Sequence, residues 1–366
     1  MVVGGGQAGL ATAQALLDSG IPCVVLERHE RVGDTWRLRY DSLRLFTPAR
    51  YDSLPGLRFP GRPDAYPTKD EVADYLERYA ARFELPVRTG VRVLRVRPGT
   101  TTRFEVETDA GIYHCGAVVV ATGTYGSAPR VPDAAHHLDP AILQLHSSEY
   151  SRPSDLPEGP VLVVGASHSG CDIAYELAAT RPTTLAGPDR GQVPLRWGAC
   201  PLRLAWPPAM ALGRHVLTRS NPLGRRLVAR LRTHGSPMLR VKRNDLAARG
   251  VVRIAVRVVG VRAGRPLLAD GRVLDPRTVI WATGFEQRFD WIDLPSVPAR
   301  GWPREVRGVA ADVPGLYFCG LAFQYSLASG DLAGVGDDAR YLARRIAAQR
   351  TRERTHRDPA RRGTPA

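Results

Sequence analysis

The sequence predicts an α/β protein of two similar units, each built on a parallel β-sheet, with the second unit inserted into the first. Two glycine-rich segments, at 4–9 and 165–170, each follow a short apolar run and precede a helical pattern. Two Ala-Thr-Gly turns, at 121–123 and 282–284, follow apolar runs in the same way. Each second motif lies 161 residues after its first copy. A chance glycine turn would not bring its partner motif at the same offset, so we predict two Rossmann-like dinucleotide-binding units.

The first glycine turn has the residue pattern of a dinucleotide cradle. Gly4 would make the tight turn, Gly6 would let the backbone approach a pyrophosphate, and Gly9 would let the helix pack closely on the strand. The next strand ends at Glu27, whose carboxylate would accept hydrogen bonds from ribose hydroxyls. A purely structural turn is the alternative. Because few residues precede Gly4, we also expect the native first strand to begin upstream of Met1.

The second glycine turn differs from the first in ways that predict a different nucleotide. Ser167 stands where the middle glycine would be, and the next strand ends at Ala186 rather than at an acid. Arg190 follows closely, which favours the 2′-phosphate of NADPH. Asp189 beside it would favour NADH, so both nicotinamide cofactors stay open on the residues alone.

Other segments set the expected domain organisation. We predict a capped helix from Thr68 to Phe83, a proline-rich linker at 151–160, and a last helix from Asp337 to Gln349. The expected limits are 1–155 with 285–366 for the first domain and 156–284 for the second, with an insert at 188–245. This insert is rich in Pro, Trp, Leu and Arg. It could cover a substrate cavity, contact an anionic surface or another subunit, or be a plain peripheral helix.

Composition narrows the class of protein. The 366 residues are 43% hydrophobic, enough for two domains with good cores. The net charge of +15 comes from arginines spread along the chain, so it argues weakly for nucleic acid, and we expect none as a partner. Its densest part, 350–366, is expected to be a disordered basic tail. Five cysteines without metal or CxxC spacing predict a cytoplasmic protein with no metal site. No apolar run is long enough to span a membrane, although peripheral membrane contact stays open.

The chain resembles the flavin-containing monooxygenases, most closely their bacterial and plant YUCCA-like branch. The resemblance covers almost the whole chain. It rests on GGGQAGL at 4–10, VLE at 25–27, VGDTWR at 32–37, DSLRLFTP at 41–48, YPTK at 66–69, ATG at 121–123, HSSEY at 146–150, VVGASHSG at 163–170, ATGF at 282–285 and GLYFCG at 315–320.

This resemblance implies a set of cofactor-binding residues. It places FAD on Gly4, Gly6, Gly9, Glu27 and Trp36, and NADPH on Gly165, Ser167, His168, Ser169, Gly170 and Arg190. Further residues expected at the two cofactors are Gln7, Ala8, Arg28, Thr122, Gly123, Gly284 and Gly320.

The chain departs from the family at two places. The fingerprint FxGxxxHxxxY/F keeps His146 and Tyr150, but Pro140 and Ile142 replace its Phe and Gly. Phe46-Thr47-Pro48 resembles the active-site turn, with Pro48 where many members have asparagine. The weak catalytic candidates are therefore His146, Thr47 and Gln324, and we expect His146 to have a structural or gating part rather than to donate protons.

The resemblance implies an NADPH-dependent flavoprotein monooxygenase. NADPH would reduce FAD, and dioxygen would form a flavin hydroperoxide that oxygenates a small organic substrate at nitrogen, sulfur or a carbonyl carbon. Two other interpretations stay open: an NADPH-dependent flavin reductase or oxidase that releases hydrogen peroxide, and a non-catalytic flavin-binding sensor. A homodimer is one option for the assembly.

Overall fold

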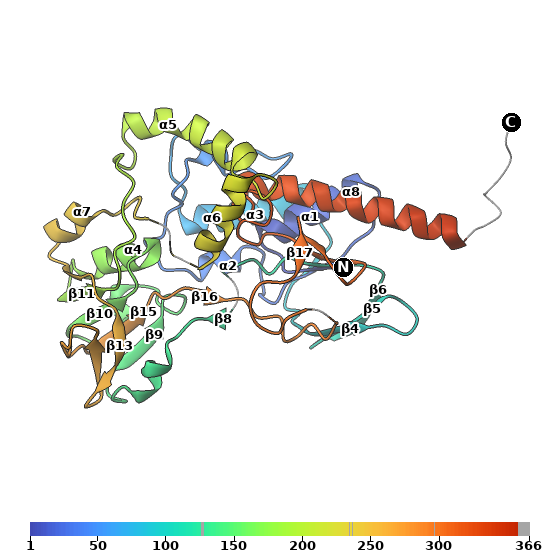
Figure 1. The fold of residues 1–366 in the computed structure, drawn as a ribbon. Coiled ribbons are helices and arrows are strands. Elements are labelled where there is room, and N and C mark those ends of the chain that lie inside the picture. The colour runs from blue at the N-terminus through green and yellow to red at the C-terminus, as the bar shows by residue number, and fades with distance from the viewer. Residues whose placement is uncertain (126–127, 234, 236, 296, 358–366) are drawn as a thin grey trace, which may run out of the picture.

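The computed structural model describes residues 1–125, 128–233, 235, 237–295 and 297–357 (Figure 1). Its helices are α1 (Gln7–Asp18), α2 (Asp34–Arg37), α3 (Lys69–Arg82), α4 (His168–Leu177), α5 (Cys200–Ala211), α6 (Pro222–Thr233), α7 (Arg243–Ala248) and α8 (Leu332–Arg357). Short 3-10 turns are η1 (Ala49–Tyr51), η2 (Asp133–His137) and η3 (Pro153–Asp155), and η4 (Leu212–Val216) is a π-helical turn that continues α5. Among the described residues, no helix is both long enough and apolar enough to span a bilayer.

The first sheet is the centre of a three-layer unit. Its order is β17 (Glu305–Val306), β18 (Val309–Ala310), β19 (Leu316–Phe318), β7 (Val118–Val120), β1 (Val2–Val3), β2 (Val25–Leu26) and β3 (Val87–Arg88), parallel from β19 onward. Successive side chains point to opposite faces. Val2 therefore packs with α1, α3 and α8, whereas Val3 packs with an antiparallel sheet made of β4 (Val93–Pro98), β5 (Phe104–Thr108) and β6 (Gly111–Cys115).

The second sheet repeats the plan of the first. Its order is β12 (Val252–Ile254), β11 (Thr183–Ala186), β10 (Val161–Val164), β15 (Thr278–Trp281) and β9 (Leu143–His146), all parallel. Val3 pairs with Val120 in the first sheet, and Val164 pairs with Trp281 in the second. Both pairs obey the offset of the sequence motifs, which confirms that the two units share one architecture.

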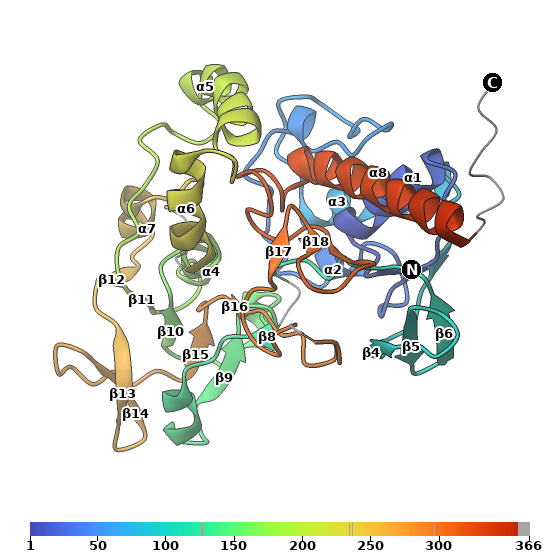
Figure 2. The same cartoon turned by 45° about the vertical axis from the view of Figure 1, so that its right-hand side comes forward.

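The connections show that the second unit is inserted into the first. All strands of the second sheet come after β7 and before β17 in the chain. Where the chain crosses between the units, β8 (Ala128–Pro129) pairs with β16 (Phe285–Glu286). A second small pair, β13 (Val258–Arg262) and β14 (Arg265–Leu268), flanks the second sheet. In both views the second sheet lies to the left of the first, and α5 of the insert lies at the top edge (Figures 1 and 2). The predicted fold class is thus confirmed. Strand β9 belongs to the second sheet although it lies before residue 155, the expected limit between the domains.

The end of the chain differs from the sequence prediction. The sequence predicts a last helix from Asp337 to Gln349 and a disordered tail from 350 to 366. In the structure α8 begins earlier, at Leu332, and continues to Arg357. Gln349 donates a hydrogen bond to Glu353 one turn later, and Glu353 forms an ion pair with Arg103 beside the first sheet. These contacts stabilise the helical turn around Glu353. The arginines of this segment had favoured a solvated tail in the sequence prediction. Residues 358–366, the rest of the expected tail, lie outside the described residues.

Candidate functional site

The first glycine turn has the geometry of an anion cradle. Gly4 has φ +105°, and a Cβ there would lie 2.7 Å from the carbonyl oxygen of Ala121. A Cβ on Gly9 would overlap the carbonyl oxygen of Gly4, so only glycine lets α1 lie this close to β1. By contrast, a Cβ on Gly6 would have no atom within 4 Å. The turn is therefore packed tightly against the sheet but open at the N-terminus of α1, where an anionic group is favoured.

Glu27 ends β2 beside this turn. It is only 6% exposed, and its carboxylate accepts hydrogen bonds from the N–H groups of Gly5 at 2.6 Å and His29 at 3.0 Å. These bonds fix the carboxylate next to the opening over the glycines. Arg28, another predicted cofactor residue, is exposed one position further along.

Residues from four separate segments meet at the same turn. The indole N–H of Trp36 donates to the Gln7 side chain at 3.2 Å, and Gln7 in turn donates to the carbonyl oxygen of Gly330 at 3.3 Å. A Cβ on Gly320 would lie 2.5 Å from the Cβ of Ala8. The loop before α8 and helix α2 thus both border the N-terminus of α1. Thr122 and Gly123, which follow β7, lie next to the same turn.

The second glycine turn reproduces these contacts with different residues. Gly165 has φ +114°, and a Cβ there would overlap the carbonyl oxygen of Ala282, just as Gly4 abuts Ala121. A Cβ on Gly170 would overlap the carbonyl oxygen of Gly165. Ser167 is the N-cap of α4, and Ser169 is exposed in its first turn. The predicted equivalence of the two turns extends to individual backbone contacts.

The charges after β11 are arranged in favour of an anion. The carboxylate of Asp189 forms an ion pair with Arg243 at 2.6 Å and accepts the N–H of Gly191 at 2.8 Å. The Gly191 N–H, with Arg243, holds the pKa of Asp189 below its usual value. Arg190, next to it, forms no ion pair with any other described residue. The charge of Asp189, the acid that favoured NADH in the sequence, is therefore neutralised by Arg243, which lies 54 residues further along the chain.

His168 joins the second cradle to the insert and to the first unit. One ring nitrogen lies 2.6 Å from the carbonyl oxygen of Pro237, and its ring centroid lies 5.7 Å from that of Phe46. Burial lowers the pKa of this imidazole. The predicted NADPH residue is thus covered by both units, and Gly284 lies at the crossing between them.

His146 has partners for both of its ring nitrogens. Nε2 lies 3.0 Å from the carbonyl oxygen of Gly284, and Nδ1 lies 2.7 Å from the Ser148 hydroxyl and 3.2 Å from the Ser148 backbone N–H. This network assigns the proton to Nε2, and burial lowers the pKa of the ring. His146 also borders a cavity of about 430 Å³ with Gln144, Glu149 and Trp281. The imidazole is therefore neutral and holds the crossing peptide at Gly284.

The other two catalytic candidates lie in different surroundings. Gln324 is fully buried, and its Oε1 accepts the N–H of Leu321 at 3.3 Å. Thr47 donates its hydroxyl to Asp52 at 2.5 Å, and both side chains are buried. The second oxygen of Asp52, Oδ2, is buried and has no hydrogen-bond partner among the described residues. Burial raises the pKa of Asp52 to about 8. Sequence analysis missed Asp52, which is the one acid in the segment 45–57, a mixed stretch with two prolines and Arg50.

The raised pKa of Asp52 predicts a pH-dependent stability. In the unfolded chain the carboxyl ionises near its usual pKa of 3.8, and in the folded chain near 8. The unfolded state therefore binds fewer protons between these values, so the free energy of unfolding falls as the pH rises. Asp52→Asn should make this fall shallower by about 1 kcal/mol per pH unit between pH 5 and pH 8 in urea unfolding. Asp290→Asn, at an exposed carboxylate, is the matched control, and parallel pH profiles for Asp52→Asn and the wild type would refute the assignment.

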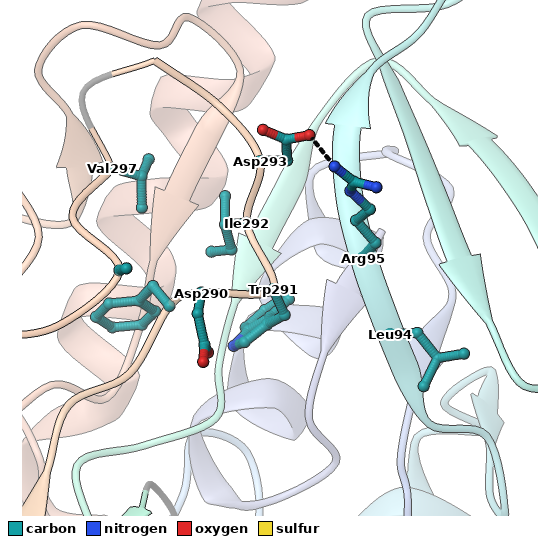
Figure 3. A pocket seen from close by; sticks show the side chains of 9 residues that line it. Leu94, Arg95, Asp290, Trp291, Ile292, Asp293 and Val297 are labelled. Atoms are coloured by element: carbon teal, nitrogen blue, oxygen red, sulfur yellow. Dashed lines mark hydrogen bonds and ion pairs between the residues drawn. The ribbon is translucent and has the colours of Figure 1, made fainter.

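Another cavity lies away from both glycine turns. It measures about 280 Å³ and lies between β4 and the segment 289–299 (Figure 3). Arg95 on β4 forms an ion pair with Asp293, and Trp291 and Leu94 line the same space. None of the predicted cofactor residues lines it.

Comparison with known proteins gives one consistent picture. The pyridine nucleotide-disulphide oxidoreductase family matches residues 1–188. The chain is 39% identical to an uncharacterized CzcO-like oxidoreductase of Geobacillus kaustophilus, over 93% of this chain and 96% of that protein. It is 29% identical to the rice indole-3-pyruvate monooxygenase YUCCA1, over 78% of this chain and 76% of that protein. A flavin-containing monooxygenase from Stenotrophomonas maltophilia superposes with a TM-score of 0.73 at 29% identity, over 95% of this chain and 97% of that one.

Proposed function

We propose that the protein uses FAD, NADPH and dioxygen to oxygenate a small organic substrate. The chain belongs to the pyridine nucleotide-disulphide oxidoreductase family and to the flavin-containing monooxygenases, and the proposal proceeds from this membership. The observation that carries the proposal is the pair of glycine turns with matching backbone contacts. The first turn lies beside Glu27, and the second lies beside Gly187, three residues before Arg190. Nitrogen, sulfur or a carbonyl carbon is the proposed acceptor of oxygen.

The first cradle fits FAD. Its open side at Gly6 has room for a pyrophosphate at the N-terminus of α1. The carboxylate of Glu27, beside the same turn, would accept hydrogen bonds from the hydroxyls of an adenosine ribose. Trp36 and Gln7 border the same opening, and Gly320 lets the loop before α8 approach Ala8. We propose that these residues, with Thr122 and Gly123, hold the flavin nucleotide.

The second cradle fits NADPH better than NADH. Gly165 and Gly170 provide the tight turn, and Ser167, His168 and Ser169 begin α4 where a pyrophosphate would lie. Arg190 follows β11 in the chain, where the sequence pattern predicts a contact with a 2′-phosphate, and the neighbouring acid Asp189 forms an ion pair with Arg243. This pairing supports NADPH, because the acid that would bind a free 2′-hydroxyl has a cationic partner.

The protein's own part in the reaction is binding, orientation and exclusion of water. When bound, the flavin supplies the redox chemistry: it accepts hydride from NADPH and, once reduced, activates dioxygen. His168 lies between Phe46 of the first unit and the Pro237 carbonyl of the insert, which closes the second cradle on two sides. A closed site limits the loss of activated oxygen to water, so these contacts serve coupling.

His146 is proposed as a positioning residue. His146→Ala removes the ring that holds Gly284 and packs on Phe285, with ring centroids 5.0 Å apart. The crossing between the units should then loosen, and we expect about a tenfold loss of product formed per NADPH oxidised with nearly full FAD content. Product yield, peroxide release and flavin absorbance measure this. Ser148→Ala, which removes only the Nδ1 hydroxyl partner, should be much milder, and equal losses of FAD and coupling would rule out the positioning role.

One experiment separates the proposed activity from its alternatives. Purified holoenzyme is given NADPH and dioxygen with sulfides, amines, ketones and 2-oxo acids in turn, and NADPH consumption, peroxide and oxygenated product are measured. Product in proportion to NADPH supports the monooxygenase. Dioxygen recovered wholly as peroxide with every substrate would favour an oxidase, and absence of NADPH oxidation would favour a sensor.

Two further aspects of the protein belong with this proposal. The cysteines at 23, 115, 171, 200 and 319 are all free, which supports a reducing, cytoplasmic location. The domain limits 1–155 with 285–366 and 156–284 are also proposed. The crossing at β16 supports the limit at 284, whereas β8 and β9 favour a first limit earlier than 155.

A further inference from the structure

The outer surface of the insert exposes apolar side chains that no described part of the chain covers. Leu204 is 74% exposed, Leu223 54%, and Leu212 and Val216 each 47%. The same stretch also exposes Pro207, Pro208, Ala209 and Ala211. A run of this kind is unusual on the surface of a water-soluble domain and marks a site of contact. We call it the outer face of the insert, defined by the exposed residues from Arg203 to Arg226 on α5, η4 and α6.

The charge of this segment has one sign. The chain contains 36 acidic residues among 366, yet no Asp or Glu lies between Asp189 and Asp245. Basic residues that point inward have acidic partners from outside the insert: Arg214 pairs with Asp337, and Arg219 and Arg232 pair with Glu305. Arg203, Arg225 and Arg226 are exposed and form no ion pair within the described part of the chain. The inner face is thus neutralised, and the outer face keeps its positive charge.

The inner side of the insert packs against the rest of the protein, which holds the outer face in a fixed orientation. Leu202 and Trp206 on the inner side of α5 are buried, and the Trp206 ring lies 6.3 Å from that of Tyr51. Arg214 reaches Asp337 at the start of α8, and the Arg232 guanidinium lies 4.1 Å from the Trp302 ring centroid. Burial of one side therefore fixes which side chains point outward.

We propose that the outer face of the insert docks on an anionic phospholipid surface. Exposed leucines can enter the boundary between headgroups and acyl chains, while arginines bind the anionic headgroups around them. A second copy of this chain fits less well, because two such faces would bring arginines together without acids to pair with them. A nucleic acid would use the arginines and leave the leucines in water. The proposal goes beyond the oxygenation reaction and does not depend on it.

The test is co-sedimentation of the holoenzyme with vesicles of phosphatidylcholine alone and of phosphatidylcholine mixed with phosphatidylglycerol. We expect binding to the mixed vesicles that weakens with added salt, and little binding to phosphatidylcholine alone. Leu204→Ser with Leu212→Ser should reduce binding about tenfold or more, and Arg225→Gln with Arg226→Gln should do the same. FAD content and thermal midpoint should stay at wild-type values in both variants, because these side chains are exposed.

A matched variant guards against binding through net charge alone. Arg257, Val259 and Arg262 are exposed at β13, far from α5 in both views (Figures 1 and 2). Arg257→Gln with Val259→Ser and Arg262→Gln should therefore leave vesicle binding unchanged. Equal binding to both vesicle types, or an equal loss in this β13 variant, would overturn the proposal. So would a dimer in analytical ultracentrifugation that Leu204→Ser dissociates, because the face would then join subunits.

Discussion

Alanine at Gly9 is expected to produce a protein that purifies without flavin. A Cβ at this position would overlap the carbonyl oxygen of Gly4, which is backbone and cannot rotate away. Helix α1 must then move off β1, which should cost about 3 kcal/mol of stability and spoil the anion site at the helix N-terminus. Absorbance of the purified protein and its thermal midpoint measure the two losses. A yellow Gly9→Ala variant with an unchanged midpoint would contradict the account of this turn.

A milder variant separates cofactor binding from folding at the same site. Gly6 has ordinary dihedral angles, and a Cβ there would meet nothing within 4 Å, so Gly6→Ala should fold normally. The added methyl group would occupy the space proposed for the pyrophosphate, and we expect FAD affinity to fall by about tenfold or more. Gly116→Ala, at an exposed glycine with equally open surroundings, is the control and should bind FAD as the wild type does.

Alanine at Gly170 is expected to separate the two cofactors. A Cβ there would overlap the carbonyl oxygen of Gly165, so the second cradle suffers the same disruption as the first does in Gly9→Ala. The first sheet and its turn are untouched, so the variant should retain FAD. Dithionite should reduce the bound flavin of this variant normally. At a given NADPH concentration, the rate of flavin reduction should be about 100-fold lower than in the wild type.

The decisive outcome for Gly170→Ala is the pattern across both cofactors. Loss of flavin reduction by NADPH, with normal FAD content, would support the proposal that each cradle binds a different cofactor. Loss of both cofactors together would show that the second unit is needed for flavin binding, and normal NADPH reduction would place the nicotinamide nucleotide elsewhere.

The fold and both cradles could be predicted because their signals are local. Glycines at 4, 9, 165 and 170 are required by backbone contacts of a kind that no other residue permits, so the sequence pattern reports the geometry directly. The capping box of α3 is similarly local: Thr68 accepts the N–H of Glu71, and Glu71 accepts the N–H of Thr68. Apolar runs such as 118–120 are buried on both faces, as a central parallel strand requires.

The features that sequence analysis missed depend on partners far away in the chain. The ion pair of Asp189 with Arg243 neutralises the acid that favoured NADH, and the ion pair of Glu353 with Arg103 stabilises α8 past its expected end. The raised pKa of Asp52 depends on the burial of its side chain, which the segment around it does not reveal by any periodicity. Such contacts follow from packing, which a local pattern does not specify.

The central claim is that two matching cradles hold FAD and NADPH so that hydride passes from one to the other. Its most direct test is to mix the flavin-loaded protein with NADPH in the absence of dioxygen and to follow the flavin absorbance. The account predicts rapid bleaching by NADPH, weaker bleaching by NADH, and recovery when dioxygen is admitted. A protein that stays colourless with added FAD, or whose bound flavin NADPH does not bleach, would contradict it.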